Sequence, residues 1–137
     1  RHYRVDEVAL LPTPVQRPRV PVWIGGFWPH RPPMRRAARW DGAVPLFLSA
    51  KHGHIPPLDE VRDLIAYVAK HRDDESGRPF EIVLGGATPT ETATAREVLG
   101  PLAEAGATWW DERQIQNERI SELDPVLRRI DAGPPDL

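Results

Sequence analysis

The sequence predicts an α/β fold in which four parallel strands alternate with four helices. Four short aliphatic runs are each followed by a segment that can form a helix, most of them with apolar residues at helical spacing. The strand runs are apolar on both faces, which is typical of a parallel sheet with right-handed crossovers. Two architectures fit this order, a small open α/β sandwich or half of an eight-stranded barrel, because a full barrel needs roughly 250 residues.

The first two strand–helix units follow one another without a long insertion. Val20–Gly26 is an apolar run closed by two glycines, so we expect a buried strand that ends in a tight turn. Pro32–Trp40 is predicted to be a short helix, since proline suits a first helical turn. Asp41–Leu48 follows as the second strand. Leu58–Arg72 then carries a regular apolar stripe and a basic C-terminal end, as a helix would.

The third unit combines a strand with a helix that contains a proline. Phe80–Gly86 is the strand, and it again ends in paired glycines. Thr88–Gly106 carries the helical pattern. Gly100 and Pro101 lie inside that pattern, and proline interrupts helix hydrogen bonding. We therefore expect the helix to break or kink there, with a short second helix that begins at Pro101.

The fourth unit closes the pattern. Ala107–Glu112 is predicted to be a strand, in which Trp109 and Trp110 point to opposite faces of the sheet. Ser121 can cap the last helix, with Asp124 three residues later, as a variant of the capping box. The apolar stripe of that helix comprises Ile120, Leu123, Val126, Leu127 and Ile130.

We divide the chain into an irregular lead-in segment, residues 1–19, and one domain, residues 20–137. Proline makes up 16 of the 137 residues, and several prolines crowd the lead-in, where each one removes a backbone donor. The chain begins at Arg1, its only methionine is Met34, and no signal-peptide pattern follows. We therefore expect it to be an internal or C-terminal part of a longer protein.

Composition excludes several classes of function. The formal net charge is -2, which argues against a general nucleic-acid binder or a binder of anionic membranes. No apolar stretch approaches the length of about 18 residues that a membrane helix needs. The chain has no cysteine, which rules out disulfides, thiolate zinc sites and cysteine nucleophiles. A cytoplasmic protein fits this composition.

The paired glycines mark the candidate binding site. Ligands of parallel α/β folds bind at the carboxyl ends of the strands. We expect Gly25, Gly26 and Phe27 at the end of the first strand, Phe47 to His54 after the second, Gly85, Gly86, Ala87 and Thr88 after the third, and Asp111 to Arg113 after the fourth. Of these, the candidate binding residues are Gly25, Gly26, Phe27, Gly85 and Gly86. Glycine lets a backbone approach a ligand, and the N–H groups of a following helix can bind a phosphate. The alternative is that these glycines only turn the chain at a strand end.

Three other patterns have a more ordinary explanation that we prefer. His52 and His54 lack a third metal ligand at a recognisable spacing, so no metal site is predicted. Asp111 and Glu112 have no evident partner for acid–base chemistry, so no catalytic residue is assigned. A basic run on the first helix could steer a phosphate, but such a run is more often a solvated helix face. Its members are Arg35, Arg36 and Arg39.

Three segments resemble the C-terminal half of luciferase-like monooxygenases. They are PTPVQRPRVPVWIGGFWPHRPPMRRAARWDGAVP, AEAGATWWDE and RRIDAGPP, and the similarity extends from about Tyr3 to Pro135. The segment from Pro14 to Gly42 is the most specific part. The family consists of flavin- or deazaflavin-dependent oxidoreductases built on a (β/α)8 TIM barrel. The resemblance therefore implies that this chain is the C-terminal half-barrel.

The resemblance also implies a cofactor and a reaction class. FMN is the expected cofactor, with a deazaflavin (coenzyme F-420) as the alternative. The expected reaction is oxygenation of a small organic substrate with dioxygen or, for a deazaflavin, hydride transfer. The loop of Gly25, Gly26 and Phe27 resembles part of the phosphate region, and Gly85 with Gly86 resembles another segment of the barrel mouth. Members of the family keep most reactive residues in the N-terminal half, so none is transferred here, and we expect this chain to be inactive by itself.

Two other functions stay open from the sequence. The chain could be a complete, non-catalytic α/β binding or assembly module. It could also be a phosphosugar-binding half-barrel that uses the two glycine pairs as phosphate loops. A half-barrel leaves two open sheet edges and an uncovered inner face, which favours association. We therefore expect either a homodimer or pairing with an N-terminal half.

Overall fold

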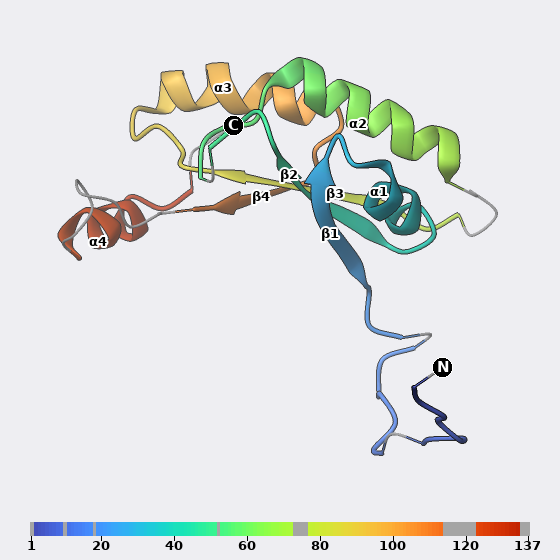
Figure 1. Cartoon of the computed structure of the whole chain (residues 1–137). Coiled ribbons are helices and arrows are strands. Elements are labelled where there is room, and N and C mark those ends of the chain that lie inside the picture. Colours follow the sequence, from blue (N-terminus) through green and yellow to red (C-terminus); the bar gives the residue numbers. More distant parts are fainter. Residues whose placement is uncertain are drawn as a thin grey trace.

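The computed structural model describes residues 2–9, 11–17, 19–51, 53–72, 77–113 and 123–134, and it confirms the predicted alternation of strands and helices. The strands form one parallel sheet in the order β1-β2-β3-β4 (Figure 1). Residues 2–9 and 11–17 contain neither helix nor strand. The elements are β1 (Trp23–Trp28), α1 (Arg31–Ala37), β2 (Gly42–Phe47), α2 (Leu58–His71), β3 (Glu81–Gly86), α3 (Thr92–Glu104), β4 (Trp109–Glu112) and α4 (Asp124–Asp131).

The pairing between strands is uneven. β1 and β2 pair over their full length, whereas β2 and β3 pair only where Gly42 faces Glu81 and Ala43 faces Ile82. Beyond these pairs the two strands separate towards their carboxyl ends. The loop after β2 reaches the end of β3, where the amide of Ala87 donates to the carbonyl of Gly53 over 2.8 Å. The sheet therefore opens at the end where a ligand site was predicted.

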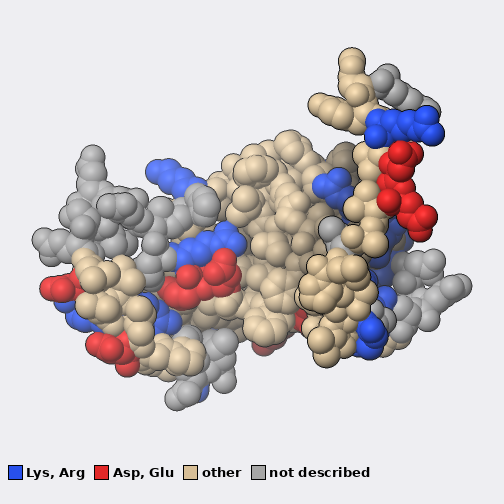
Figure 2. All heavy atoms as spheres, turned by 90° about the horizontal axis from the view of Figure 1, so that it is seen from below, with Lys and Arg blue, Asp and Glu red and all other residues tan. Residues whose placement is uncertain are grey.

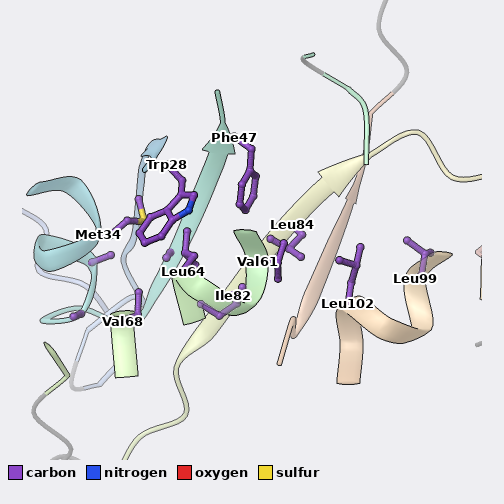
Figure 3. Packing of buried hydrophobic residues seen from close by; sticks show 13 residues of the cluster. Trp28, Met34, Phe47, Val61, Leu64, Val68, Ile82, Leu84, Leu99 and Leu102 are labelled. Atoms are coloured by element: carbon purple, nitrogen blue, oxygen red, sulfur yellow. The ribbon is translucent and has the colours of Figure 1, made fainter. Parts of the chain in front are cut away.

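The hydrophobic core lies between the sheet and the layer formed by α1, α2 and α3. Figure 3 shows side chains from the strands pointing towards those from the helices. Its largest fully buried members come from α1, α2 and β3, namely Met34, Leu64, Val61 and Leu84. Burying such a side chain stabilises the fold by about 1.5–3 kcal/mol. This layer therefore fixes one face of the sheet.

α2 forms as the apolar stripe predicts. Val61, Leu64 and Val68 lie at helical spacing and are buried against the sheet. Asp59 and Glu60 occupy its first turn, and basic residues occupy its last turn, so the charges complement the helix dipole. The helix ends at His71, one residue before the predicted end.

The predicted break in the third helix is wrong. α3 runs without interruption from Thr92 to Glu104 and includes Pro101. A proline inside a helix costs about 3 kcal/mol, but Leu99 and Leu102 on either side of it are both buried in the core. Burial on both sides of the proline explains why one helix persists. Glu91 caps its start, accepting hydrogen bonds from the amides of Ala93 and Thr94.

The first strand also differs from the prediction. It was expected to end in a tight turn at Gly25–Gly26, but β1 begins at Trp23 and continues through Trp28. Neither glycine has a positive φ, so the backbone does not turn there. The chain continues because Trp28 is buried in the core and pairs with Phe47 of β2. The other three strands lie within their predicted ranges.

The last helix covers nothing among the described residues. α4 buries none of its side chains, and Figure 1 shows it beyond the end of β4, apart from the layer of α1–α3. Its apolar stripe is exposed, with Leu123 and Ile130 at 66% and 67%. Ser121, the predicted cap, and Ile120 lie outside the described residues. The stripe is therefore present but unpartnered.

No helix of the described residues covers the second face of the sheet, which we call the bare face. Trp23, Phe27 and Trp109 point to this face and are 39%, 48% and 53% exposed. Figure 2 shows this underside, where the middle of the surface is almost free of charged side chains. Trp110, next to Trp109, packs against the core on the opposite face, which confirms the predicted alternation. The sheet thus has one covered face and one apolar open face.

Candidate functional site

A small cavity lies at the carboxyl ends of β1, β2 and β3. Its volume is about 90 Å³, well below the ~300–1,000 Å³ of a complete pocket for a small molecule. Part of its wall is apolar, from Phe27 and the end of β2, and part is polar, from the loop after β2 and from Arg113. The lining residues are Phe27, Pro45, Leu46, Phe47, Ala50, Lys51, Gly53, His54, Pro56, Gly85 and Arg113.

Basic side chains surround this cavity. Lys51 and His54 come from the loop after β2 and are exposed, and Arg113 directly follows β4. Arg113 is largely buried, and its Nε lies 2.7 Å from a carboxylate oxygen of Asp111, so this ion pair orients its guanidinium. The cavity can therefore offer N–H donors to an anion.

The glycine pair of β1 lies within the strand and outside the cavity lining. Gly26 faces the helices, and a Cβ atom there would overlap Pro33 of α1 and approach Met34. Glycine at this position is explained by the close packing of α1 on β1. Gly25 faces the bare side, where a Cβ would meet only the carbonyl of Val44 at 3.8 Å. An approach of a cofactor to Gly25 stays a prediction.

The glycines of β3 also have internal neighbours. A Cβ on Gly85 would lie 2.6 Å from Nε of Arg113, so this glycine makes room for the arginine at the cavity. A Cβ on Gly86 would lie 3.1 Å from the backbone of His54, so that glycine admits the loop after β2. Of the five predicted site residues, Phe27 and Gly85 line the cavity.

The N-terminus of α1 offers few donors to a phosphate. The helix has seven residues, and its first turn contains Pro32 and Pro33, which lack N–H groups. Arg31 is engaged elsewhere, with its guanidinium 4.2 Å from the ring of Trp28 and 4.6 Å from that of Tyr67. The basic side chains around the cavity are thus better placed donors than this helix end.

Thr88 organises the rim between β3 and β4. Its side chain is buried and donates to a carboxylate oxygen of Glu112, and its amide donates to the other oxygen over 3.1 Å. Nε1 of Trp110 donates to Oγ1 of Thr88 over 2.9 Å. Nε of Arg129, in α4, lies 3.6 Å from Oε1 of Glu112. Glu112 is therefore a fixed structural carboxylate that links β3, β4 and α4.

A larger cavity, of about 340 Å³, lies at the opposite end of the sheet. Trp23, Trp109 and Glu81 line it, and Nε1 of Trp109 donates to Glu81 over 3.1 Å. At its edge, Asp41 accepts hydrogen bonds from Arg19 and from the amide of Val22. The bond from Arg19 is the main reason that the pKa of Asp41 lies below its ordinary value.

No metal centre emerges from the described residues. They contain no group of three histidine or acidic side chains that could hold an ion. His54 lies at the cavity, whereas His52 lies outside the part of the chain that the structure describes. Within the same residues, no helix is both long and apolar enough to cross a membrane.

The sequence placed Lys51 and Arg113 after predicted strands, at the ligand end of the sheet, but gave neither a binding role. Lys51 lies four residues after the end of β2, and Arg113 is the first residue after β4. Their positive charge is the signal that could have identified them. Such residues gather at one edge of a parallel sheet, where ligands bind.

Comparisons with known proteins identify no family for this chain. It matches no protein-family model, no curated protein and no solved structure.

Proposed function

We propose that this chain is the C-terminal half of a luciferase-like, flavin-dependent oxidoreductase and that it binds the phosphate end of the cofactor. The observation that carries this proposal is the position of the basic cavity. It lies at the carboxyl ends of parallel strands, beside an apolar sheet face that the chain leaves open. Active sites of α/β barrels lie at this end of the strands.

The open face supports the half-barrel. In a closed barrel the helices cover the outside and the inner side chains of the strands pack on one another. Here α1, α2 and α3 cover one face, and Phe27 and Trp109 remain exposed on the other (Figure 2). The second half of the barrel would cover that inner face.

The cavity fits a phosphate and not a whole flavin. Lys51, His54 and Arg113 can donate to phosphate oxygens, as guanidinium and ammonium groups commonly do. A volume of about 90 Å³ cannot enclose a three-ring system, so the ring would extend beyond the cavity. A bound flavin would supply oxygen activation or, for a deazaflavin, hydride transfer. The residues of this chain would hold the phosphate and exclude water from one side.

A phosphosugar site shares the same anion chemistry. The two glycine pairs support a phosphosugar site less than the sequence alone indicated. Pro33 and the backbone of His54 fill the space beside Gly26 and Gly86. The basic cavity remains available to either ligand. The experiment therefore has to compare flavin phosphates with a sugar phosphate.

The test is a titration of the chain with FMN, riboflavin, coenzyme F-420 and glucose 6-phosphate. We expect FMN to bind more tightly than riboflavin, which lacks the phosphate. The variant Lys51→Glu should lower FMN affinity by roughly tenfold, since it puts a like charge beside the phosphate. FMN fluorescence measures flavin binding directly. The displacement of bound FMN measures the affinity for the sugar phosphate.

The chain provides a matched control for this variant. Its other lysine, Lys70, is also exposed but lies in the last turn of α2, near the opposite end of the sheet. Lys70→Glu should leave FMN affinity unchanged. Equal affinity for FMN and riboflavin, or equal losses in the two variants, would contradict the phosphate site. Tighter binding of glucose 6-phosphate would favour the sugar alternative.

A further inference from the structure

The sheet ends in two free edges of the same polarity. Among the described residues, β1 pairs only with β2, and β4 pairs only with β3. All four strands are parallel, so both edges run in the same direction. A twofold rotation about an axis along the strands would place β1 of one copy beside β4 of another, and the reverse, with both new pairs parallel.

The two ends of the sheet carry opposite charge. Residues 19–40, which contain β1 and α1, hold five arginines and no acidic residue. Residues 91–113, which contain α3 and β4, hold five acidic residues and two arginines. Contact between the β1 end of one copy and the β4 end of another therefore brings unlike charges together. Contact between two identical ends would bring like charges together, which is unfavourable.

The apolar surfaces fit the same arrangement. α4 follows β4, lies beyond its carboxyl end and leaves its apolar stripe exposed. Among the described residues, the free edge of β4 and this stripe are thus both uncovered at the same side of the sheet. The bare sheet face, with Phe27 and Trp109, would become an interior.

We propose that two copies of this chain associate through both free edges and close an eight-stranded barrel with twofold symmetry. In this dimer β1 of each copy pairs with β4 of the other, and the bare faces pack together inside. In this dimer a second copy takes the place that the proposed function gives to an N-terminal half, so the inference rests on the half-barrel and not on which cofactor binds.

The test measures the mass of the chain in solution by sedimentation over a wide range of protein concentrations. We expect a species of twice 15.5 kDa, in equilibrium with a monomer at low concentration. Dimerisation should weaken as salt is added, because surface charges are screened. A monomer at all concentrations would overturn the proposal. Open-ended larger assemblies would overturn the closed form.

Variants locate the interface. The double variant Arg35→Glu and Arg39→Glu changes exposed side chains at the β1 end and should weaken dimerisation by roughly tenfold or more. The matched control, Arg62→Glu with Lys70→Glu, makes the same charge change on α2, between the two edges, and should not weaken it. Equal effects of the two pairs would contradict the assigned edges.

A third variant tests the bare face at a residue outside the lining of the cofactor cavity. Trp109→Lys places a charge on the bare face at a residue already 53% exposed, so we expect the chain to fold and dimerisation to fall at least tenfold. Circular dichroism checks the fold. A dimer that does not bind FMN would refute the proposed function alone, whereas an FMN-binding monomer would refute the dimer alone.

Discussion

The indole rings of Trp23 and Trp109 lie with their centroids 5.6 Å apart, although they belong to the first and last strands of the sheet. In a flat sheet these strands would lie roughly 14 Å apart. The rings meet because Trp23 lies across Gly42 of the intervening strand, where a Cβ would be 2.6 Å from its Cδ1. Gly42 therefore makes an aromatic contact across the bare face possible.

The first prediction concerns this glycine. Gly42→Ala should destabilise the fold by about 1–3 kcal/mol, since the new methyl group would press on Trp23 and on the backbone of Glu81. Near-UV circular dichroism should also change as the tryptophan moves. Gly25→Ala is the control, because a Cβ there would meet only the carbonyl of Val44 at 3.8 Å, so its free energy of unfolding should change by less than about 0.5 kcal/mol. Urea unfolding at one protein concentration measures both, and a neutral Gly42→Ala would disprove the contact.

The second prediction compares the two glycines of β1. Gly26→Ala should cost about 1–3 kcal/mol, because the methyl group would overlap Pro33 of α1. Gly25→Ala should change the free energy of unfolding by less than about 0.5 kcal/mol, since its space is open. If a cofactor approaches the backbone at Gly25, this second variant should still lose FMN affinity. Two equally destabilised variants would show that the faces are assigned wrongly.

The third prediction tests the buried threonine at the rim. Thr88→Val keeps the shape of the side chain but removes the hydroxyl that donates to Glu112 and accepts from Trp110. We expect a loss of about 1–3 kcal/mol in urea unfolding, because a hydrogen bond to a carboxylate disappears. Thr92→Val, at an exposed position, should have a much smaller effect. A stable Thr88→Val variant would mean that the rim does not depend on this hydroxyl.

The fourth prediction is a pH dependence. The hydrogen bond from Arg19 keeps the pKa of Asp41 below its ordinary value of 3.8. The folded state therefore favours the carboxylate, and this contribution is complete above the unfolded-state pKa and is lost as pH falls through the lower folded-state pKa. Asp41→Asn should lower stability by about 1–2 kcal/mol at neutral pH, and less below pH 3.8. If the free energies of unfolding of the unaltered chain and of Asp41→Asn differ by the same amount from neutral pH to strong acid, the lowered pKa of Asp41 is contradicted.

The candidate site was only partly predictable. The pattern of the sequence indicated the end of the sheet at which the small cavity lies, and Phe27 and Gly85 line that cavity. Lys51 and Arg113 were expected at this end but were not assigned to the site, because no local motif marks them as ligand-binding residues. They come together only because the carboxyl ends of β2 and β3 separate and admit the loop after β2. That separation is a property of strand pairing, which residue spacing does not encode.

The sequence by itself determined the four strands, their alternation with helices and the buried stripe of α2, because apolar periodicity acts locally along each element. Only the tertiary structure decided that β1 continues past Gly26 and that α3 continues through Pro101. In both places the burial of neighbouring side chains outweighs the local preference for a turn or a break. These side chains are Trp28 in β1, and Leu99 and Leu102 in α3. The tertiary structure likewise decided that one sheet face stays open, since coverage depends on where the helices pack.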